Sequence, residues 1–520
     1  MSKARDLADL LDSSGDVKAA KLDNVLEINT TATSNIGLGT GAVDSITTGD
    51  YNVGVGDNAL TATTSGSRNT AIGYTALATN TTGNYNTANG REALYTNLTG
   101  SSNTGLGYQA LLFNTTASNN TGVGYHALRA NTTGNNNTAS GYQSLYSNTT
   151  GTHNVASGRE ALKSNTTGNY NVANGCAALY YNTTASNNTA SGYASLFKNT
   201  TGTQNTASGT NALFSNTTAS YNTASGYEAL YSNTTGSENT AVGRKALHKN
   251  ITGANNTAVG LDSMWSNTTG SNNTATGYQA LVYNTTGTQN TASGMYALHL
   301  NTTGSHNTAS GYQAGFNVTT GSNNVFVGRK AGFYATSQTT GNTSTFLGSY
   351  SYPLDGNSGS CIVVGHAVGG ADGYTTIGHG SNDIRALHGN VTWATVSDER
   401  YKKDIVDSTV GLSFVNALQP RTFKYRTLGE LPTTFNAYEA DSTEVFKNSN
   451  TNHGFIAQEV KAAIDADAGV KDGFRLWDDR PDGSQEVAET ALIPVLVKAV
   501  QELSAENKAL LTRIEALENA

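Results

Sequence analysis

The stretch TWATVSDERYKKDI, residues 392–405, gathers residue types that often do chemistry in proteins. Ser397 lies there among acids and bases, after several hundred residues that are nearly neutral. A serine hydroxyl is a weak nucleophile at neutral pH and needs a nearby base to accept its proton. Two interpretations follow from the residue types alone: a nucleophile at a domain junction, or a solvated, charged turn that opens a domain.

The nearly neutral region before this stretch is a repeat with a period of seventeen. NTAIGYTALATNTTG at 69–83 returns, for example, as NTATGYQALVYNTTG at 273–287. One glycine per copy recurs at this interval, beginning with Gly39, Gly56 and Gly73 and ending at Gly328, without a slip. A fixed period without insertions indicates that each of the eighteen copies stacks on the preceding one.

Positions within a copy differ in residue type. Asn stands four residues before the glycine from Asn69 to Asn324, and a second Asn recurs from Asn80 to Asn301. Identical Asn side chains can hydrogen-bond along a stack of strands. The position two residues before the glycine is almost always Ala or Gly, with Phe326 as the late exception, which indicates a tightly packed inward site. Leu stands four residues after the glycine in most copies, as at Leu77, Leu94 and Leu111, and Met264 takes this place in one of them.

We therefore expect a mainly β protein whose shaft is a β-solenoid, or β-helix, with one rung per copy. Each rung has a short strand NTAxG, a tight glycine turn, a segment xALxxN and a TTG turn. The xALxxN segment is compatible with a second strand or with one helical turn. At about 4.8 Å per rung, eighteen rungs form a rod on the order of 85 Å long. Each rung buries one Leu, two small residues and part of an aromatic ring, so we expect several chains to associate and supply the missing burial.

A row of Tyr and Arg follows the repeat glycine. Tyr fills this position in half of the copies from Gly73 on, and Arg fills it at Arg91, Arg159, Arg244 and Arg329. The row could bind sugars, or it could be a packing ladder at an interface between chains, which we favour. Eight acidic and eleven basic residues lie between 39 and 345, so a carboxylate pair for glycoside cleavage is poorly supplied there. Glycosylation of the N-x-T triplets and ice binding by the Thr arrays are weaker alternatives.

Composition excludes several classes of protein. The net charge of -8 and the lack of a Lys/Arg stripe give no basic footprint for nucleic acid. No apolar run is long enough to span a bilayer, so we expect no membrane insertion, and the start MSKARDLADLLDSSGDVKAA lacks the apolar segment of a secretory signal. Cys176 and Cys361 are too few for a disulfide framework and have no CxxC spacing, so we expect incidental thiols and neither a metal nor a cofactor.

The pattern changes beyond the repeats. Residues 351–396 keep strand and glycine signals at looser spacing and indicate a tapering neck. Mixed strand and helix signals follow from Ser397 on, and the chain ends in a helix with apolar residues at 3-4 spacing from Ile493 to Leu517. This heptad pattern predicts a coiled coil over 493–517, with Asn507 fixing the register. Its choice of apolar residues favours a dimer when such a helix is isolated.

Four blocks of the C-terminal region carry a family resemblance: SDERYKKDI, GLSFVNALQPRTFKYR, HGFIAQEV and ALIPVLVKAVQEL. In this order they resemble the intramolecular chaperone domain of phage tail spikes and fibres, the self-cleaving endosialidase-type peptidase family (S74-like). The resemblance covers roughly residues 395–520. Residues 1–29 are similar to leaders that attach tail fibres to the virion, and the repeats resemble the head repeats of trimeric adhesins, whose period is usually shorter.

The resemblance implies self-cleavage between Val396 and Ser397, with Ser397 as nucleophile and Lys402 as its base. Two side chains five residues apart lie on opposite faces of a strand, or about 140° apart on a helix, so this pair can meet only across a bend or between chains. Asp398 and Glu399 would hold Lys402 charged unless Arg400 and Lys403 take up those carboxylates. Three further residues are candidates for support of the chemistry: His453, for which we favour a structural hydrogen-bonding role, and Gln458 and Glu459, whose role is open.

These observations predict a homotrimeric phage tail fibre, a receptor-binding protein assembled in the host cytoplasm and carried on the virion. We expect a leader at 1–29, a shaft at 30–350, a neck at 351–396 and a self-releasing chaperone at 397–520. Expected partners are two further copies, the phage tail and a host-surface glycan or protein. A bacterial trimeric adhesin with the same chaperone and a glycan depolymerase are the alternatives, and we expect no activity on external substrates.

Overall fold

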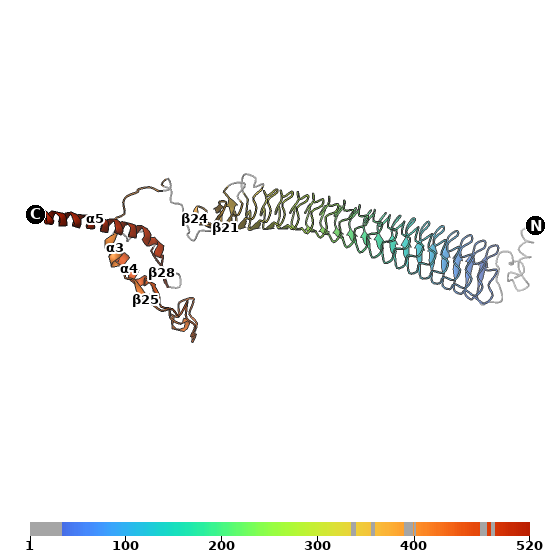
Figure 1. The fold of residues 1–520 in the computed structure, drawn as a ribbon. Helices are drawn as coiled ribbons and strands as arrows, with labels where there is room; N and C mark the ends of the chain where they lie inside the picture. The colour runs from blue at the N-terminus through green and yellow to red at the C-terminus, as the bar shows by residue number, and fades with distance from the viewer. Residues whose placement is uncertain are drawn as a thin grey trace, which may run out of the picture. The chain divides into compact units, whose positions relative to one another are not determined.

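The computed structural model describes residues 34–333, 340–354, 359–388, 399, 402–467, 476–479 and 484–519. The chain divides into two compact units, Met1–Val396 and Ser397–Ala520. In the first, rungs stack one after another along a shaft (Figure 1). The second contains helices and short strands. No helix among the described residues has the length and apolar character needed to cross a bilayer.

Each rung of the shaft contributes one strand of three residues, TAx in most copies. Neighbouring strands are parallel and pair equivalent positions, for example Thr189 with Thr206. Every rung is therefore in register with the next at the spacing of the sequence repeat, which confirms the β-solenoid. The strands are β1 (Ile36–Leu38), β2 (Val53–Val55), β3 (Thr70–Ile72), β4 (Thr87–Asn89), β5 (Thr104–Leu106), β6 (Thr121–Val123), β7 (Thr138–Ser140), β8 (Val155–Ser157), β9 (Val172–Asn174), β10 (Thr189–Ser191), β11 (Thr206–Ser208), β12 (Thr223–Ser225), β13 (Thr240–Val242), β14 (Thr257–Val259), β15 (Thr274–Thr276), β16 (Thr291–Ser293), β17 (Thr308–Ser310), β18 (Val325–Val327) and β19 (Thr345–Leu347).

The repeat glycine is required by both backbone conformation and space. Gly73 has φ of 132°, and a Cβ there would lie 2.6 Å from the carbonyl oxygen of Gly90 in the next rung. A side chain at this position would thus strain the backbone and force adjacent rungs apart. The same relation recurs from rung to rung, which explains why the glycine never varies.

The xALxxN segment is neither a strand nor a helical turn. Its first residue and its Leu both have left-handed backbone, with φ of 53° at Thr75 and at Leu77. Alternation of left-handed and ordinary residues interrupts both regular structures. Hydrogen bonds between rungs hold this conformation instead: Leu77 N–H donates to Ala93 O at 2.9 Å, and Thr81 N–H donates to Leu98 O at 2.8 Å. The inter-rung backbone ladder therefore continues outside the three-residue strands.

Two ladders of buried Asn run along the shaft and confirm the predicted stacking. In the first, Asn69 Nδ2 donates to Asn52 Oδ1 at 3.1 Å and to Gly83 O at 2.9 Å. In the second, Asn97 Nδ2 donates to Asn80 Oδ1 at 2.8 Å. These amides are fully buried beside the row of repeat Leu and the two rows of small residues. Each rung thus satisfies its buried polar groups through its neighbours, as a polar interior requires.

The ends of the second ladder explain two unsatisfied atoms. Thr63 and Val318 occupy the positions where the ladder would continue, and both are buried. Within the described residues, Thr63 Oγ1 and Asn301 Oδ1 have no hydrogen-bond partner. The ladder therefore begins at Asn80 and ends at Asn301 because the next residue in each direction cannot supply an amide.

The core changes composition near the end of the shaft. Phe326 and Phe346 stack at 5.5 Å in the row that otherwise holds Ala or Gly. Gly315 and Gly332 stand where other rungs have Leu, and a Cβ at either would lie 2.8 Å or less from the ring of Phe326. Large and small residues have thus exchanged places at these rungs.

The sheet continues into the neck and ends there. β19 pairs with β21 (Ile362–His366) and β21 with β23 (Tyr374–His379), all in parallel. β24 (Asn382–Leu387) then pairs with β23 in the antiparallel sense and closes the stack. A separate pair of strands, β20 (Tyr352–Pro353) and β22 (Gly369–Gly370), lies beside it.

The C-terminal unit has one small core. Its elements are α3 (Leu412–Ala417), β25 (Arg421–Phe423), the 3-10 helix η2 (Leu428–Glu430), β26 (Asn452–Gly454), α4 (Ala457–Ala466), β27 (Trp477–Asp479), β28 (Gln485–Val487), the 3-10 helix η3 (Glu489–Leu492) and α5 (Ile493–Glu518). Nine residues from α3, α4, η3, α5 and the adjoining segments form the core: Val410, Phe414, Leu418, Val460, Ala463, Ile464, Leu476, Leu492 and Val495.

Candidate functional site: the junction, the terminal helix and the edge of the shaft

The predicted cleavage site lies at the boundary between the two units. Val396, Ser397, Asp398 and Arg400 fall outside the described residues, so the pairing of Ser397 with Lys402 stays a prediction. The backbone N–H of Lys402 donates to the carbonyl oxygen of Glu399 at 2.9 Å, and its side chain is exposed. A lysine serves as a base where burial or neighbouring cations favour loss of its proton.

The supporting candidates occupy one small region of the C-terminal unit. His453 lies in β26, opposite Thr422 of β25, and is exposed. Gln458 and Glu459 lie in the first turn of α4, where Gln458 is exposed. Glu459 accepts two hydrogen bonds from the guanidinium of Arg421, at 2.7 and 3.0 Å. The Arg421 contact lowers the pKa of Glu459 and so keeps its carboxylate ionised. The resulting ion pair links β25 to α4.

Glu502 is a structural residue that the sequence motifs did not reveal. Its carboxylate on α5 accepts a hydrogen bond from the backbone N–H of Leu412 at 2.7 Å, at the start of α3. No side chain within α3 caps that end, because its N-cap residue is Gly411. A Cβ at Gly411 would lie 2.3 Å from the Glu502 carboxylate, so the glycine makes room for this contact. A cap supplied by a distant helix leaves no local pattern in sequence.

The terminal helix α5 has two apolar faces. Val495 and Ala499 face the core of their own unit and are buried. The predicted heptad residues lie on another face and are exposed in the single chain: Ile493, Leu496, Val500, Leu503, Leu510, Ile514 and Leu517. Val497 and Leu511, each beside a heptad Leu, are also more than half exposed and widen this face. We call these nine residues the α5 seam.

A third feature lies along one edge of the shaft. It consists of positions one, two, five and six after each repeat glycine, and we call it the aromatic edge. Position one includes the stacked rings of Tyr108, Tyr125 and Tyr142, with centroids 5.2 and 5.4 Å apart. Position five includes a longer stack with neighbouring centroids 5.1 to 6.0 Å apart, formed by Phe197, Phe214, Tyr231, His248 and Trp265. The row at position five was missed because only the residue after the glycine was considered as a surface row.

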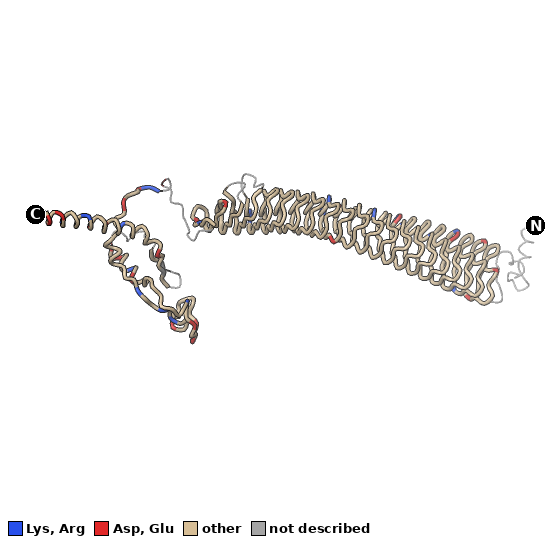
Figure 2. Tube along the Cα trace, in the orientation of Figure 1, with Lys and Arg blue, Asp and Glu red and all other residues tan. Residues whose placement is uncertain are grey.

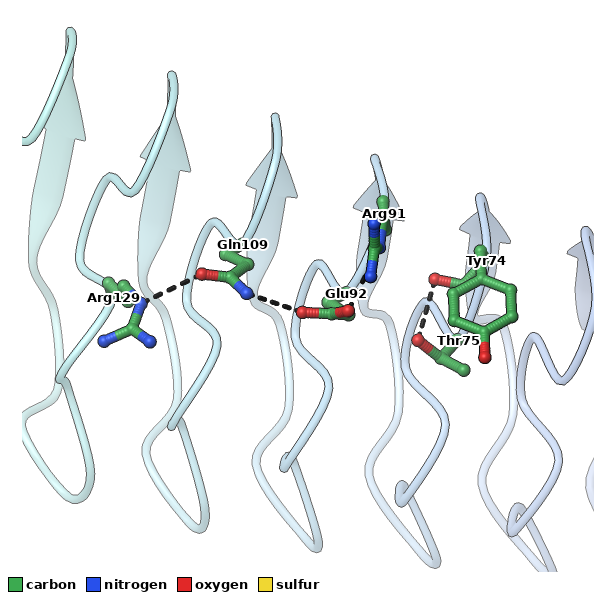
Figure 3. A network of polar contacts seen from close by, with 6 residues as sticks. All are labelled: Tyr74, Thr75, Arg91, Glu92, Gln109 and Arg129. Atoms are coloured by element: carbon green, nitrogen blue, oxygen red, sulfur yellow. Dashed lines mark hydrogen bonds and ion pairs between the residues drawn. The ribbon is translucent and has the colours of Figure 1, made fainter.

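Polar side chains at position two lie between these rows of rings. Glu92 accepts hydrogen bonds from Arg91 Nε at 3.1 Å and from Gln109 Nε2 at 2.6 Å (Figure 3). Gln109 Oε1 in turn accepts one from Arg129 Nε at 3.1 Å, so the network crosses three rungs. Glu228 forms a similar cluster with Lys245 and His248. Carboxylates here are held by cations of the same chain, which does not suit a glycosidase acid–base pair.

The rings of the aromatic edge are already stacked within one chain. The ring planes of Tyr125 and Tyr142 are 8° apart, and both side chains are about half exposed. These rings form a ladder inside one chain, whereas the packing ladder that we favoured for position one was expected at an interface between chains. Whether an interface between chains covers it stays a prediction.

The two thiols and possible metal ligands form no site in the part of the chain that the structure describes. Cys361 is buried and Cys176 half-buried, and neither forms a disulfide. No group of three or more His, Cys, Asp or Glu side chains is arranged there to hold a metal ion.

Comparison with known families finds a match within the C-terminal unit. The family described as chaperone of endosialidase matches residues 397–469, from the predicted nucleophile to the end of α4. Neither a curated protein nor a solved structure matched the chain. A β-solenoid shaft followed by an endosialidase-type chaperone segment fits a protein of the tail-fibre type.

Proposed function

We propose that three copies of this chain form a phage tail fibre that adheres to the host surface. Its C-terminal unit joins the three chains during folding and is then released by cleavage between Val396 and Ser397. Residues 1–29 attach the fibre to the tail. The observation that carries the proposal is the α5 seam, a heptad stripe left exposed beside a segment of the chaperone family.

The width of the seam supports a trimer over the dimer that the heptad residues alone favour. Val497 and Leu511 broaden the seam beyond the two heptad positions, and a wider apolar face suits a bundle of more than two helices.

The boundary between the compact units coincides with the proposed scissile bond, so cleavage would separate shaft from chaperone without cutting either. Burying one apolar side chain is worth roughly 1.5–3 kcal/mol, so the seam offers a large driving force.

Self-cleavage and assembly are tested together by expressing the full chain. Intact mass should show a shaft ending at Val396 and a fragment beginning at Ser397, and light scattering should give three shafts per particle. Ser397→Ala and Lys402→Ala should each form trimers of uncut chains, whereas Lys424→Ala, at an exposed lysine away from the junction, should cut normally. A folded wild-type trimer that stays full length would contradict the proteolytic role, and a monomer would contradict the fibre.

A further inference from the structure

The aromatic edge carries nearly all the charge of the shaft. Between residues 57 and 333 there are eleven basic residues, and ten of them lie on this edge: Arg91, Arg129, Arg159, Lys163, Lys198, Arg244, Lys245, Lys249, Arg329 and Lys330. Only Arg68 lies elsewhere. The same edge holds five of the six acidic residues in that range: Asp57, Glu92, Glu160, Glu228 and Asp262. Figure 2 shows how sparse charge is on the shaft and that most of it follows one long edge.

This edge therefore has an excess of five positive charges, ten cations less five acids, on a chain whose net charge is -8. Arg91 and Arg159 form ion pairs with Glu92 and Glu160, yet their side chains stay 59% and 66% exposed, and ten cations outnumber five acids along the edge. A local positive potential on an acidic protein attracts anionic partners.

Aromatic rings accompany these cations along the edge. Lys249 Nζ lies 3.8 Å from the ring centroid of Trp265, and Arg91 lies over the rings of both Tyr74 and Tyr108. Tyr125, Tyr142 and Tyr193 are about half exposed. The edge thus offers cations, phenol hydroxyls and amide groups on rungs about 4.8 Å apart, a spacing comparable to the length of one hexose unit.

Charge also argues against the edge as the interface of a trimer. If it faced a threefold axis, three copies of each cation would meet at the same height, and juxtaposed like charges are costly. The strand face and the TTG turns carry no charged residue from 57 to 333, so contact between chains through those faces has no such cost. A trimer packed in that way would leave its three aromatic edges outward.

We propose that the aromatic edge binds a polysaccharide that bears carboxylate groups, running along the shaft axis. This deepens the host-adhesion role proposed above and rests on it. Guanidinium and ammonium groups would pair with the carboxylates, while Tyr hydroxyls and Gln amides would bond to sugar hydroxyls. Nucleic acid is the other polyanion to consider, and the stacked rings disfavour it because their faces are not open to bases.

The test uses the full chain, with its trimeric state checked first by light scattering. Immobilised protein is exposed to polygalacturonate and hyaluronate, to uncharged dextran, and to polyglutamate and oligo-dT as polyanions without sugar acids. We expect at least one of the acidic polysaccharides to bind, more weakly as salt is raised, and dextran not to bind. Equal or tighter binding of polyglutamate or oligo-dT, or no binding of either acidic polysaccharide, would overturn the proposal.

Variants locate the binding on the edge. Arg159→Gln, Arg244→Gln and Lys249→Gln together should weaken binding about tenfold, since three exposed charge pairs are lost. Tyr142→Ala with Tyr193→Ala should weaken it without changing its salt dependence. Arg68→Gln, a cation outside the edge, should leave it unchanged. If Arg68→Gln weakens binding as much as the triple variant does, the site is not on the aromatic edge. A wild-type chain that light scattering shows to be monomeric would instead count against the proposed fibre.

Discussion

At the scale of single residues, Phe326 shows how strongly one rung constrains the next. Its ring fills space that a Leu side chain occupies in earlier rungs, and Gly315 and Gly332 leave room for it. The repeat pattern identified Phe326 as exceptional, but not its compensation. Neither glycine is a sequence neighbour of Phe326, and only their positions in the stacked rungs bring all three together.

Phe326 and Gly315 should therefore be energetically coupled. Gly315→Leu should destabilise the shaft by about 1–3 kcal/mol through overpacking, and Phe326→Ala by about 3–5 kcal/mol through the cavity it leaves. The double variant restores the ordinary Leu and Ala pair, so its loss should be smaller than that of Phe326→Ala alone. Thermal midpoints at one fixed scan rate measure this. Additive losses would show that the ring and the glycine do not share one space.

The unfinished Asn ladder offers a stabilising substitution. Thr63→Asn would present an Oδ1 to the Nδ2 of Asn80, as Asn80 does to Asn97. We expect a gain of about 1 kcal/mol, because a buried hydrogen bond forms and an unsatisfied hydroxyl is removed. Thr63→Ser keeps the hydroxyl and should give no gain. A lower thermal midpoint for Thr63→Asn would mean that the first rungs cannot accommodate the amide.

At the scale of elements, sequence spacing predicted the rung but not its path. Period, glycine and Asn positions are enough to establish a parallel stack, because each recurs at a fixed place in every copy. The left-handed backbone at Thr75 and Leu77 has no such signature, since non-glycine residues rarely adopt it. Bonds to the neighbouring rungs hold it in place. The Arg421–Glu459 pair and the Glu502 cap likewise leave no local pattern in the sequence, because both join segments far apart in the chain.

The Glu502 contact should decide the stability of helix α3. Glu502→Ala should cost about 1–2 kcal/mol, since a charged acceptor at the helix start is lost. Hydrogen exchange of residues 412–418 should then accelerate, while exchange in the shaft stays the same. Glu506→Ala, one turn along α5 and exposed, is the matched control. Unchanged exchange in Glu502→Ala would show that α3 is held by its apolar contacts alone.

Two histidines on the aromatic edge predict a pH dependence of the shaft. Burial lowers the pKa of His126, and the positive charge of Arg129 lowers it further. Burial also lowers the pKa of His299. A folded pKa below the unfolded value of 6.5 means that the unfolded chain binds protons first. Stability is thus complete above pH 6.5 and falls as the pH drops below it. The thermal midpoint should decline between about pH 7.5 and about pH 5, and less so in His126→Gln with His299→Phe. A parallel decline in that variant would assign the effect to other groups.

At the scale of the whole molecule, the near-identity of the rungs creates a problem of register. Chains shifted by one full rung would lose little packing, because most positions repeat. The unique features are concentrated near the C-terminal end of the shaft, in the Phe326–Phe346 stack and the neck strands. A chaperone that follows them in the chain can align three chains where register is distinguishable, after which rungs add one by one toward the N-terminus.

This order of assembly predicts that the α5 seam is needed to reach the folded state and dispensable afterward. Leu503→Asp with Leu510→Asp should abolish trimers and leave the chains uncut and aggregated, because charges enter the seam. Ala505→Asp with Thr512→Asp adds the same two charges outside the seam and should assemble normally. Wild-type shafts purified after cleavage lack the seam, yet they should stay trimeric for days, since unfolding must cross a high kinetic barrier. Dissociation of the cleaved shaft on dilution would show instead that the coil holds the fibre together throughout its life.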